Sequence, residues 1–185
     1  ALAESVCKIV IEGMLVAKLD LTFATVSTVT AKATASYPSG MENFSWAGGV
    51  VTIGGSSVDV TEISISGDNK LEGDRYIRGN TAGKEPFSKG LREVAFSIKC
   101  DWESMTQYNR VASATAAGAV ATIVGTWTGP TLIGTTTYPK VIATIHSARF
   151  DEIKNTVDGP DPLTQELTGV GLGPAAGTTP ITIAV

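Results

Sequence analysis

The sequence is poor in charge, in aromatic side chains, in histidine and in cysteine. Charged residues make up 17% of the 185 positions, below the quarter typical of soluble domains. This shortage indicates either that part of the surface is hidden in an assembly, or that a threonine-rich β surface stays soluble without charge. The two cysteines, Cys7 and Cys100, are too few for a disulfide framework, so we expect buried free thiols.

The sequence also lacks the patterns of catalytic and cofactor sites. His146 is the only histidine and lies within the strand-like segment "IATIHSARF", and no G-x-S-x-G motif is present. The segment "GDNKLEGD" departs from a calcium loop because Lys70 occupies the third position counted from Asp68, where an acidic or amide ligand is needed. The glycine-rich run 169–177 is interrupted by Pro174, unlike a dinucleotide-binding turn. We therefore expect no catalytic residue, metal or cofactor.

Charge and hydropathy restrict the partners. The net charge is −4, and the chain contains no run of Lys or Arg, which argues against tight binding to a phosphate backbone or to an anionic membrane surface. No apolar run approaches the roughly 18 residues that span a bilayer, so no membrane insertion is expected.

Strand-like alternation dominates the first third of the chain. Apolar residues of one parity over Ile9–Phe23 predict one long strand or two collinear strands, and small and β-branched residues continue to position 38. Val50–Ile53 and Val58–Ser66 predict a hairpin around two glycines. The parity changes at Thr61-Glu62, which predicts a β-bulge there.

The stretch "EVAFSIKCDWESMTQYNRVAS" predicts a half-buried strand that leads into the only secure helix. Apolar residues alternate from Val94 to Trp102. Ser104 and Gln107 have the spacing of a capping box, so we expect a helix over 104–114. Met105, Tyr108 and Val111 share one face of this helix, which we expect to pack on the outside of a sheet.

The remaining chain alternates between strands and loops. Residues 67–90 predict a long, charged, exposed loop with a short hairpin at its tip, and a loop of this length often has a function. Strands are expected in 119–129 and 140–150, and two short strands near the C-terminus. The sequence thus predicts an all-β, mainly antiparallel fold, a two-sheet β-sandwich or part-open barrel with one flanking α-helix. Residues 1–156 form the domain, and 157–185 add its last strands or a C-terminal arm.

The order of these segments resembles that of a known family. The hairpin ending "VDVTEISISGDN", the charged loop, the strand "GLREVAFSI" entering a short helix, and "VDGPDPLTQEL" before a final Thr/Ile-rich strand follow one another. This layout, over roughly residues 50–185, resembles the major tail tube proteins of long-tailed, non-contractile (siphovirus-type) bacteriophages.

The resemblance implies a structural virion protein without enzymatic activity. In that family two packed antiparallel sheets form the subunit, one sheet joins its neighbours to line a pore, and hexameric rings stack into a tube that conducts double-stranded DNA without binding it tightly. The implied partners are further copies of the chain and the tail terminator and tail tip proteins. The implied location is the phage tail, after assembly in the host bacterial cytoplasm.

Three groups of residues take roles by the same resemblance. The loop becomes the contact between rings, the helix covers the outward flank, and the last segment forms a C-terminal arm. The loop residues are Asp68, Lys70, Glu72, Asp74, Arg75, Arg78 and Lys84; the helix residues are Met105, Tyr108 and Val111; the arm residues are Asp158, Pro160, Asp161 and Leu163.

Other functions remain open on the sequence alone. A capsid decoration or tail terminator protein would share the β-rich composition but form only small closed assemblies. A carbohydrate-binding β-sandwich could use Trp46 or Trp127 as a sugar platform, whereas Trp102 shares the apolar face of a strand and is expected in the core. A hydrolase would have to use Asp or Glu.

Overall fold

The computed structural model describes residues 6–12, 14–20, 43–72, 87–112, 120–132, 136–156, 159, 162–173 and 179–185. Almost all regular structure in these ranges is β-strand. The elements are β1 (Val6–Glu12), β2 (Met14–Asp20), a 3-10 turn (Trp46–Gly48), β3 (Gly49–Ile53), β4 (Ser56–Val58), β5 (Val60–Asp68), β6 (Leu71–Glu72), β7 (Phe87–Ser88), β8 (Glu93–Asp101), α1 (Met105–Ala112), β9 (Ala121–Thr128), β10 (Lys140–Thr156), β11 (Thr164–Leu172) and β12 (Ile181–Ala184).

Most of these strands belong to one antiparallel sheet that does not close on itself. Its order is β2-β1-β5-β8-β11-β10-β9-β3-β4, and β12 adds to β10 beside this path. The predicted all-β, mainly antiparallel fold with one helix is confirmed.

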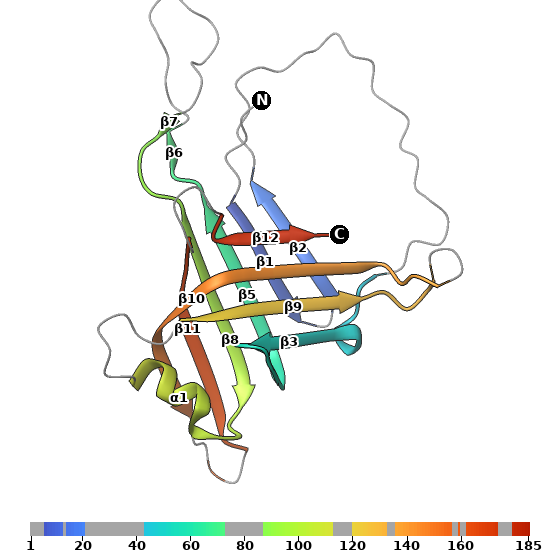
Figure 1. Ribbon diagram of the computed structural model, residues 1–185, viewed down its shortest axis with the longest axis vertical. Coiled ribbons are helices and arrows are strands. Elements are labelled where there is room, and N and C mark those ends of the chain that lie inside the picture. Colours follow the sequence, from blue (N-terminus) through green and yellow to red (C-terminus); the bar gives the residue numbers. More distant parts are fainter. Residues whose placement is uncertain are drawn as a thin grey trace, which may run out of the picture.

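The sheet folds into two layers because β10 belongs to both (Figure 1). Its first part pairs with β9 and β12, and its second part pairs with β11, with a register shift between Phe150 and Glu152. A bulge of this kind bends a strand and increases its twist. We call β4, β3, β9, the first part of β10 and β12 the β9 layer, and β2, β1, β5, β8, β11 and the rest of β10 the β8 layer. In Figure 1 the strands of the β9 layer run across those of the β8 layer.

The core lies between the two layers and follows from the alternation of the strands. Each layer contributes a row of large aliphatic side chains that are at most 1% exposed. The rows are Ile53–Ile123–Ile145 in the β9 layer and Ile63–Ile98–Leu167 in the β8 layer. Full burial of such a side chain stabilises the fold by about 1.5–3 kcal/mol, so these rows hold the layers together.

Gly169 lies where β10 passes between the layers. It pairs with Phe150, directly before the register shift. A Cβ atom at this position would collide with the backbone oxygen of Arg149 and would lie 2.9 Å from the ring of Phe96. The close approach of β11 to the bent β10 therefore requires a glycine here.

The N-terminal prediction was wrong in its geometry. Instead of running collinearly, β1 and β2 fold back on each other, with Ile9 opposite Ala17 and Ile11 opposite Leu15. Residues of one parity still share one face, because antiparallel partners point to the same side of a sheet. Alternation identifies the shared face but carries no information on where the chain reverses. Residues 21–42, including the predicted extension to position 38, lie outside the described residues.

The predicted hairpin and bulge are confirmed. Gly54 and Gly55 have φ angles of +62° and +84° at the turn between β3 and β4, where glycine is strongly favoured. The register shifts between Val60 and Glu62 where β5 pairs with β8. The return strand is divided, however: β4 pairs with β3, whereas β5 pairs with β1 and β8. Asp59 therefore links the two layers.

A short hairpin lies at the base of the 67–90 loop, whereas the tip, where a hairpin was predicted, falls outside the described residues. The two-residue strands β6 and β7 pair Leu71 with Ser88 and Glu72 with Phe87. The segment 73–86 between them lies outside the described residues. We call the part formed by residues 69–72 and 87–90 the β6–β7 arm.

The helix begins as predicted but without the full capping box. The Ser104 hydroxyl accepts the backbone N–H of Thr106 at 3.3 Å, as an N-cap does. The side-chain oxygen of Gln107 accepts instead from Nε of Arg110 at 2.8 Å. α1 packs against β10, with Val111 against the core. Its described part ends at Ala112, so positions 113–114 of the prediction lie outside the described residues.

Candidate assembly surfaces

The outer face of the β9 layer is a grid of small uncharged side chains. Strand pairing aligns them in two rows on the face opposite the core. The rows are Val50–Thr126–Ile142–Ala184 and Thr52–Val124–Thr144–Thr182. Val50 is 52% exposed. The nearest charge in the pairing pattern is Lys140, opposite Thr128 at one end of the layer. No described helix covers this uncharged grid.

The outer face of the β8 layer is charged and internally paired. One row crosses four strands with alternating sign, Glu62–Lys99–Glu166–Lys154. Lys99 Nζ lies 2.6 Å from Glu62 Oε2, and Lys154 Nζ lies 3.5 Å from Glu152 Oε2. The charges on this face largely neutralise each other, and exposed pairs of this kind each contribute at most about 1 kcal/mol.

In the large sheet, β2, β4 and β12 each leave one edge without a partner among the described residues, and so does β10 beyond Ala148, where it pairs only with β11. A free edge presents unpaired N–H and C=O groups that can bind another chain. β12 is fixed to β10 by its ladder, by the N–H of His146 donating to Pro180 O at 3.2 Å, and by a 2.8 Å hydrogen bond between His146 Nε2 and Thr182 Oγ1. His146 thus has a structural partner, as expected for a residue of the sheet wall.

Apolar side chains gather beside the β12 edge. Ile183 is 48% exposed, and Tyr138, two residues before β10, is 43% exposed. A cavity of about 550 Å³ is lined by residues 136–140, Ile142, Ala184 and Val185. This end of the β9 layer therefore combines a free edge with exposed apolar surface.

The β6–β7 arm and the adjacent Asp68, the last residue of β5, hold three of the predicted loop residues in ion pairs. Lys70 Nζ lies 2.8 Å from Asp68 Oδ2 and 3.2 Å from Glu93 Oε2, and Lys89 Nζ lies 2.8 Å from Glu72 Oε2. The side-chain hydrogen bond from Lys70 lowers the pKa of Asp68, and the hydrogen bonds to Asp68 and Glu93 raise the pKa of Lys70. These groups are exposed, so the pairs orient the arm more than they stabilise the fold.

The other predicted loop residues, Asp74, Arg75, Arg78 and Lys84, lie outside the described part of the chain.

The predicted helix and arm residues are not brought into one site. Met105 and Tyr108 are exposed, and the Tyr108 ring lies 6.3 Å from that of Trp102. Leu163 is half-buried and its carbonyl accepts the N–H of Trp102 at 2.8 Å. Trp102 is half-buried rather than part of the core, because β8 ends at Asp101. Asp158, Pro160 and Asp161 fall outside the described residues.

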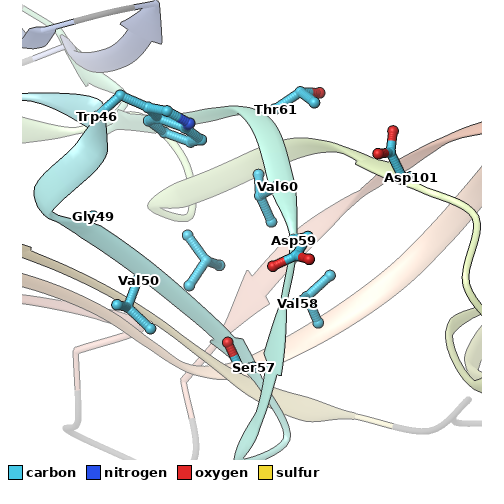
Figure 2. Close-up of a pocket in the computed structure, with 10 residues that line it drawn as sticks. Trp46, Gly49, Val50, Ser57, Val58, Asp59, Val60, Thr61 and Asp101 are labelled. Carbon is cyan, nitrogen blue, oxygen red and sulfur yellow. The ribbon is translucent and has the colours of Figure 1, made fainter.

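The tryptophans offer little for sugar binding. Trp127 is fully buried, so it cannot serve as a sugar platform. Trp46 is half-buried and lines a cavity of about 280 Å³ together with Asp59 and Asp101 (Figure 2). In this view Trp46 lies at one end, Asp101 at the other and Asp59 between them.

Cys100 is a buried free thiol, as expected. Burial, followed by the nearby charges of Asp101 and Glu103, raises its pKa to about 11, so the reactive thiolate is scarce at neutral pH. The side chain of Cys7 lies outside the described set.

No group of three His, Cys, Asp or Glu side chains in the described ranges could hold a metal ion. No described helix is long and apolar enough to cross a membrane.

Sequence reasoning missed the edges and the uncharged grid. Strand order is set by long-range pairing, which one sequence does not reveal. The grid did leave a signal: the outward positions of β3, β9 and β12 are Val, Thr or Ala without one charge, unlike those of β8, which include Glu93, Lys99 and Asp101.

Comparisons with known proteins agree with this architecture. A search of curated proteins found no match. Among solved structures, the chain is similar to the tube-terminating cap of an anti-feeding prophage, with a TM-score of 0.54 and 16% identity over 86% of this chain and 99% of that one. At this identity the likeness concerns the fold alone. Residues 8–171 match the family described as phage tail tube protein, so the chain belongs to that family of structural phage tail proteins.

Proposed function

We propose that this chain is the tube subunit of a long, non-contractile phage tail, assembling into hexameric rings that stack into a tube. The tube conducts double-stranded DNA to the host without binding it tightly. Its ends meet the tail terminator and tail tip proteins. The subunit has no catalytic activity, assembles in the host bacterial cytoplasm and remains in the virion tail.

The observation that carries this proposal is an open sheet in a member of the tail tube family. A ring closes through one heterologous interface repeated by rotation, and rings stack through a second contact. Free strand edges and exposed apolar side chains supply the first kind of surface, and copies of the chain would complete them. The loop of residues 67–90 supplies the contact between rings, α1 covers the outer flank, and residues 157–185 complete the domain.

The test is assembly of the purified chain. Negative-stain electron microscopy should show tubes of uniform diameter, with six-fold symmetry in end views. Analytical ultracentrifugation over a wide concentration range should show large species in equilibrium with small ones. A chain that stays strictly monomeric under all conditions would contradict the proposal.

A second candidate is a terminator that closes a tube end. The similarity to a tube-terminating cap favours it, because that protein has the same fold over nearly its whole length. The two functions differ in the product: a terminator forms single rings and adds to tube ends, whereas a tube protein extends without a fixed limit. The length distribution in the same micrographs distinguishes them.

A further inference from the structure

We propose that the β12 edge of one copy pairs with the β4 edge of the next copy around the ring. The β9 layer then continues from copy to copy, with its uncharged grid facing the lumen. This inference rests on the proposed ring assembly and specifies the surfaces that build it.

The free edges of the two layers differ in charge. A heterologous ring that continues one sheet needs two different free edges on that sheet. In the described part of the chain the β9 layer has both, β4 at one side and β12 at the other. The β8 layer also has two, β2 and the part of β10 beyond Ala148, which pairs only with β11. Both of these edges carry charged residues: Lys18 and Asp20 on β2, and Arg149, Asp151, Glu152 and Lys154 on β10. In the described part of the chain, only the β9 layer therefore has two free edges whose strands, β4 and β12, contain no charged residue.

The directions of β4 and β12 decide how the two edges meet. Each neighbouring pair from β4 through β3, β9 and β10 to β12 is antiparallel. Four such steps give β4 and β12 the same direction. When the ring axis runs nearly parallel to these strands, rotation from one copy to the next leaves the strand direction unchanged. The β12 strand of one copy then meets β4 of the next copy as a parallel pair. Parallel ladders are only slightly less stable per residue than antiparallel ones.

The edge strand β12 lacks the protection that edge strands usually carry. Sheet edges that remain free in solution are usually protected by charges, proline, bulges or a covering loop. The β12 strand "ITIA" has no charge or proline, is followed by an exposed Val185, and pairs with β10 without a register shift. The β2 strand "MLVAKLD" carries Lys18 and Asp20. The edge of β12 therefore has the character of an interface.

This arrangement makes the outer face of the β9 layer the wall of the lumen. A lumen lined by Lys or Arg would hold DNA through its phosphates and release counterions. The two rows of the uncharged grid contain no ionisable side chain, in contrast to the alternating row on the β8 layer. DNA passing the β9 layer meets hydroxyl and methyl groups without fixed charge.

Cross-linking tests the edge pairing. In a Cys7→Ser background, Ser57→Cys on β4 is combined with Ala184→Cys on β12, and tubes are treated with a short bis-maleimide. Cys100 is buried and serves as the unreactive internal control. Denaturing electrophoresis should show a ladder of covalent oligomers up to the ring number. The matched control pairs Ala184→Cys with Lys18→Cys on β2 and should give no ladder. A ladder in the control but not in the β4–β12 pair would overturn the inference.

Reagent size tests the face. Thr126→Cys in the same background should react with small and with large polymer-linked maleimides in the unassembled subunit. In tubes the small reagent should still react, whereas labelling by the large one should fall at least tenfold. Equal labelling by both reagents, or protection from both, would show that this face does not line the lumen.

The two levels of the proposal fail differently. If the unmodified chain forms no tubes or rings, the proposed function fails and this inference with it. If tubes form but the β4–β12 cysteine pair gives no ladder, or Thr126→Cys reacts equally with small and large reagents, only the assignment of edges and face is wrong.

Discussion

The two layers of this protein have similar interiors and opposite exteriors. Each inner face carries a row of large aliphatic side chains that are almost completely buried. Their outer faces differ: the β9 layer presents Val, Thr, Ile and Ala, whereas the β8 layer presents the alternating row from Glu62 to Lys154. The packing of the core does not require this difference between the outer faces. We therefore attribute the difference to what surrounds each face.

The contrast between the two outer faces is clearest in β10, because this one strand contributes residues to both. Before its bulge β10 adds Ile142 and Thr144 to the uncharged grid, and after it adds Lys154 to the charged row. The change of composition coincides with the change of layer. A charged, internally neutralised face suits solvent, and an uncharged one suits a surface that is contacted or passed by another molecule.

The largest expected effect comes from breaking the junction between the layers. Gly169→Ala places a methyl group against the backbone of β10, which cannot yield as a flexible side chain would. We expect a loss of more than about 2 kcal/mol in the free energy of unfolding, or no folded protein. Gly67→Ala, where a Cβ meets open space, is the matched control and should change it by less than about 0.5 kcal/mol. Urea titration followed by tryptophan fluorescence gives both values, and equal stabilities would contradict the account of the junction.

The next effect concerns the uncharged grid. Thr126→Lys should leave the subunit folded, because the side chain is half-exposed, but should place a ring of positive charge on the proposed lumen wall. Tubes of this variant should retain double-stranded DNA in co-sedimentation at low salt and release it as salt rises. Thr126→Gln controls for side-chain size. If both variants retain as little DNA as the unmodified tubes, the grid is not in the path of DNA.

A smaller effect is expected on the charged face. Lys99→Glu replaces the cation between Glu62 and Glu166, so that three acidic side chains are neighbours in one row. We expect a loss of about 1 kcal/mol in the free energy of unfolding, partly restored by salt, because like charges directly opposite repel each other. Thr126→Glu, whose row contains no acid, should cost less and respond less to salt. The reverse order of the two variants would show that the row contributes nothing through charge.

The smallest effect is the pH dependence of the β6–β7 arm. The pKa of Asp68 is lowered and those of Lys70 and Lys89 are raised by their ion pairs. The carboxylate contribution is therefore present at neutral pH and lost as the pH falls below about 4, and the lysine contributions are lost as it rises above about 10. Hydrogen exchange of the Lys89 amide, which donates to Lys70 O at 2.8 Å, should show faster opening at both extremes after correction for intrinsic rates. If the opening rate of the Lys89 amide does not change with pH over this range, the ion pairs do not hold the arm closed.

The sequence predicted local structure well and spatial arrangement less well. The alternation from Val94 to Cys100 gave strand and buried face together, and the two glycines gave the turn between β3 and β4. Both features depend on residues a few positions apart. The reversal between β1 and β2 left no such signal, because parity is the same for a straight strand and for its antiparallel return.

The candidate surfaces depended on information that local patterns do not contain. An edge strand can be recognised only when the pairing of all the other strands is known, so in the sequence β12 looked like any short terminal strand. The charged loop attracted attention because its composition is unusual, yet its described lysines are already paired with neighbouring acids. The absence of charge over β3, β9 and β12 was readable but becomes meaningful only when these strands are seen side by side.

The shared strand β10 has a consequence for how this chain can vary. Removing one residue from β10 before the bulge would shift its ladders with β9 and β12 by one position and turn the grid residues inward. Removing one residue after the bulge would shift the ladder with β11 and turn the charged row inward. The length of each half is thus as constrained as the identity of its side chains. Insertions and deletions should be confined to the connections between strands, where they alter what the subunit touches without altering which way it faces.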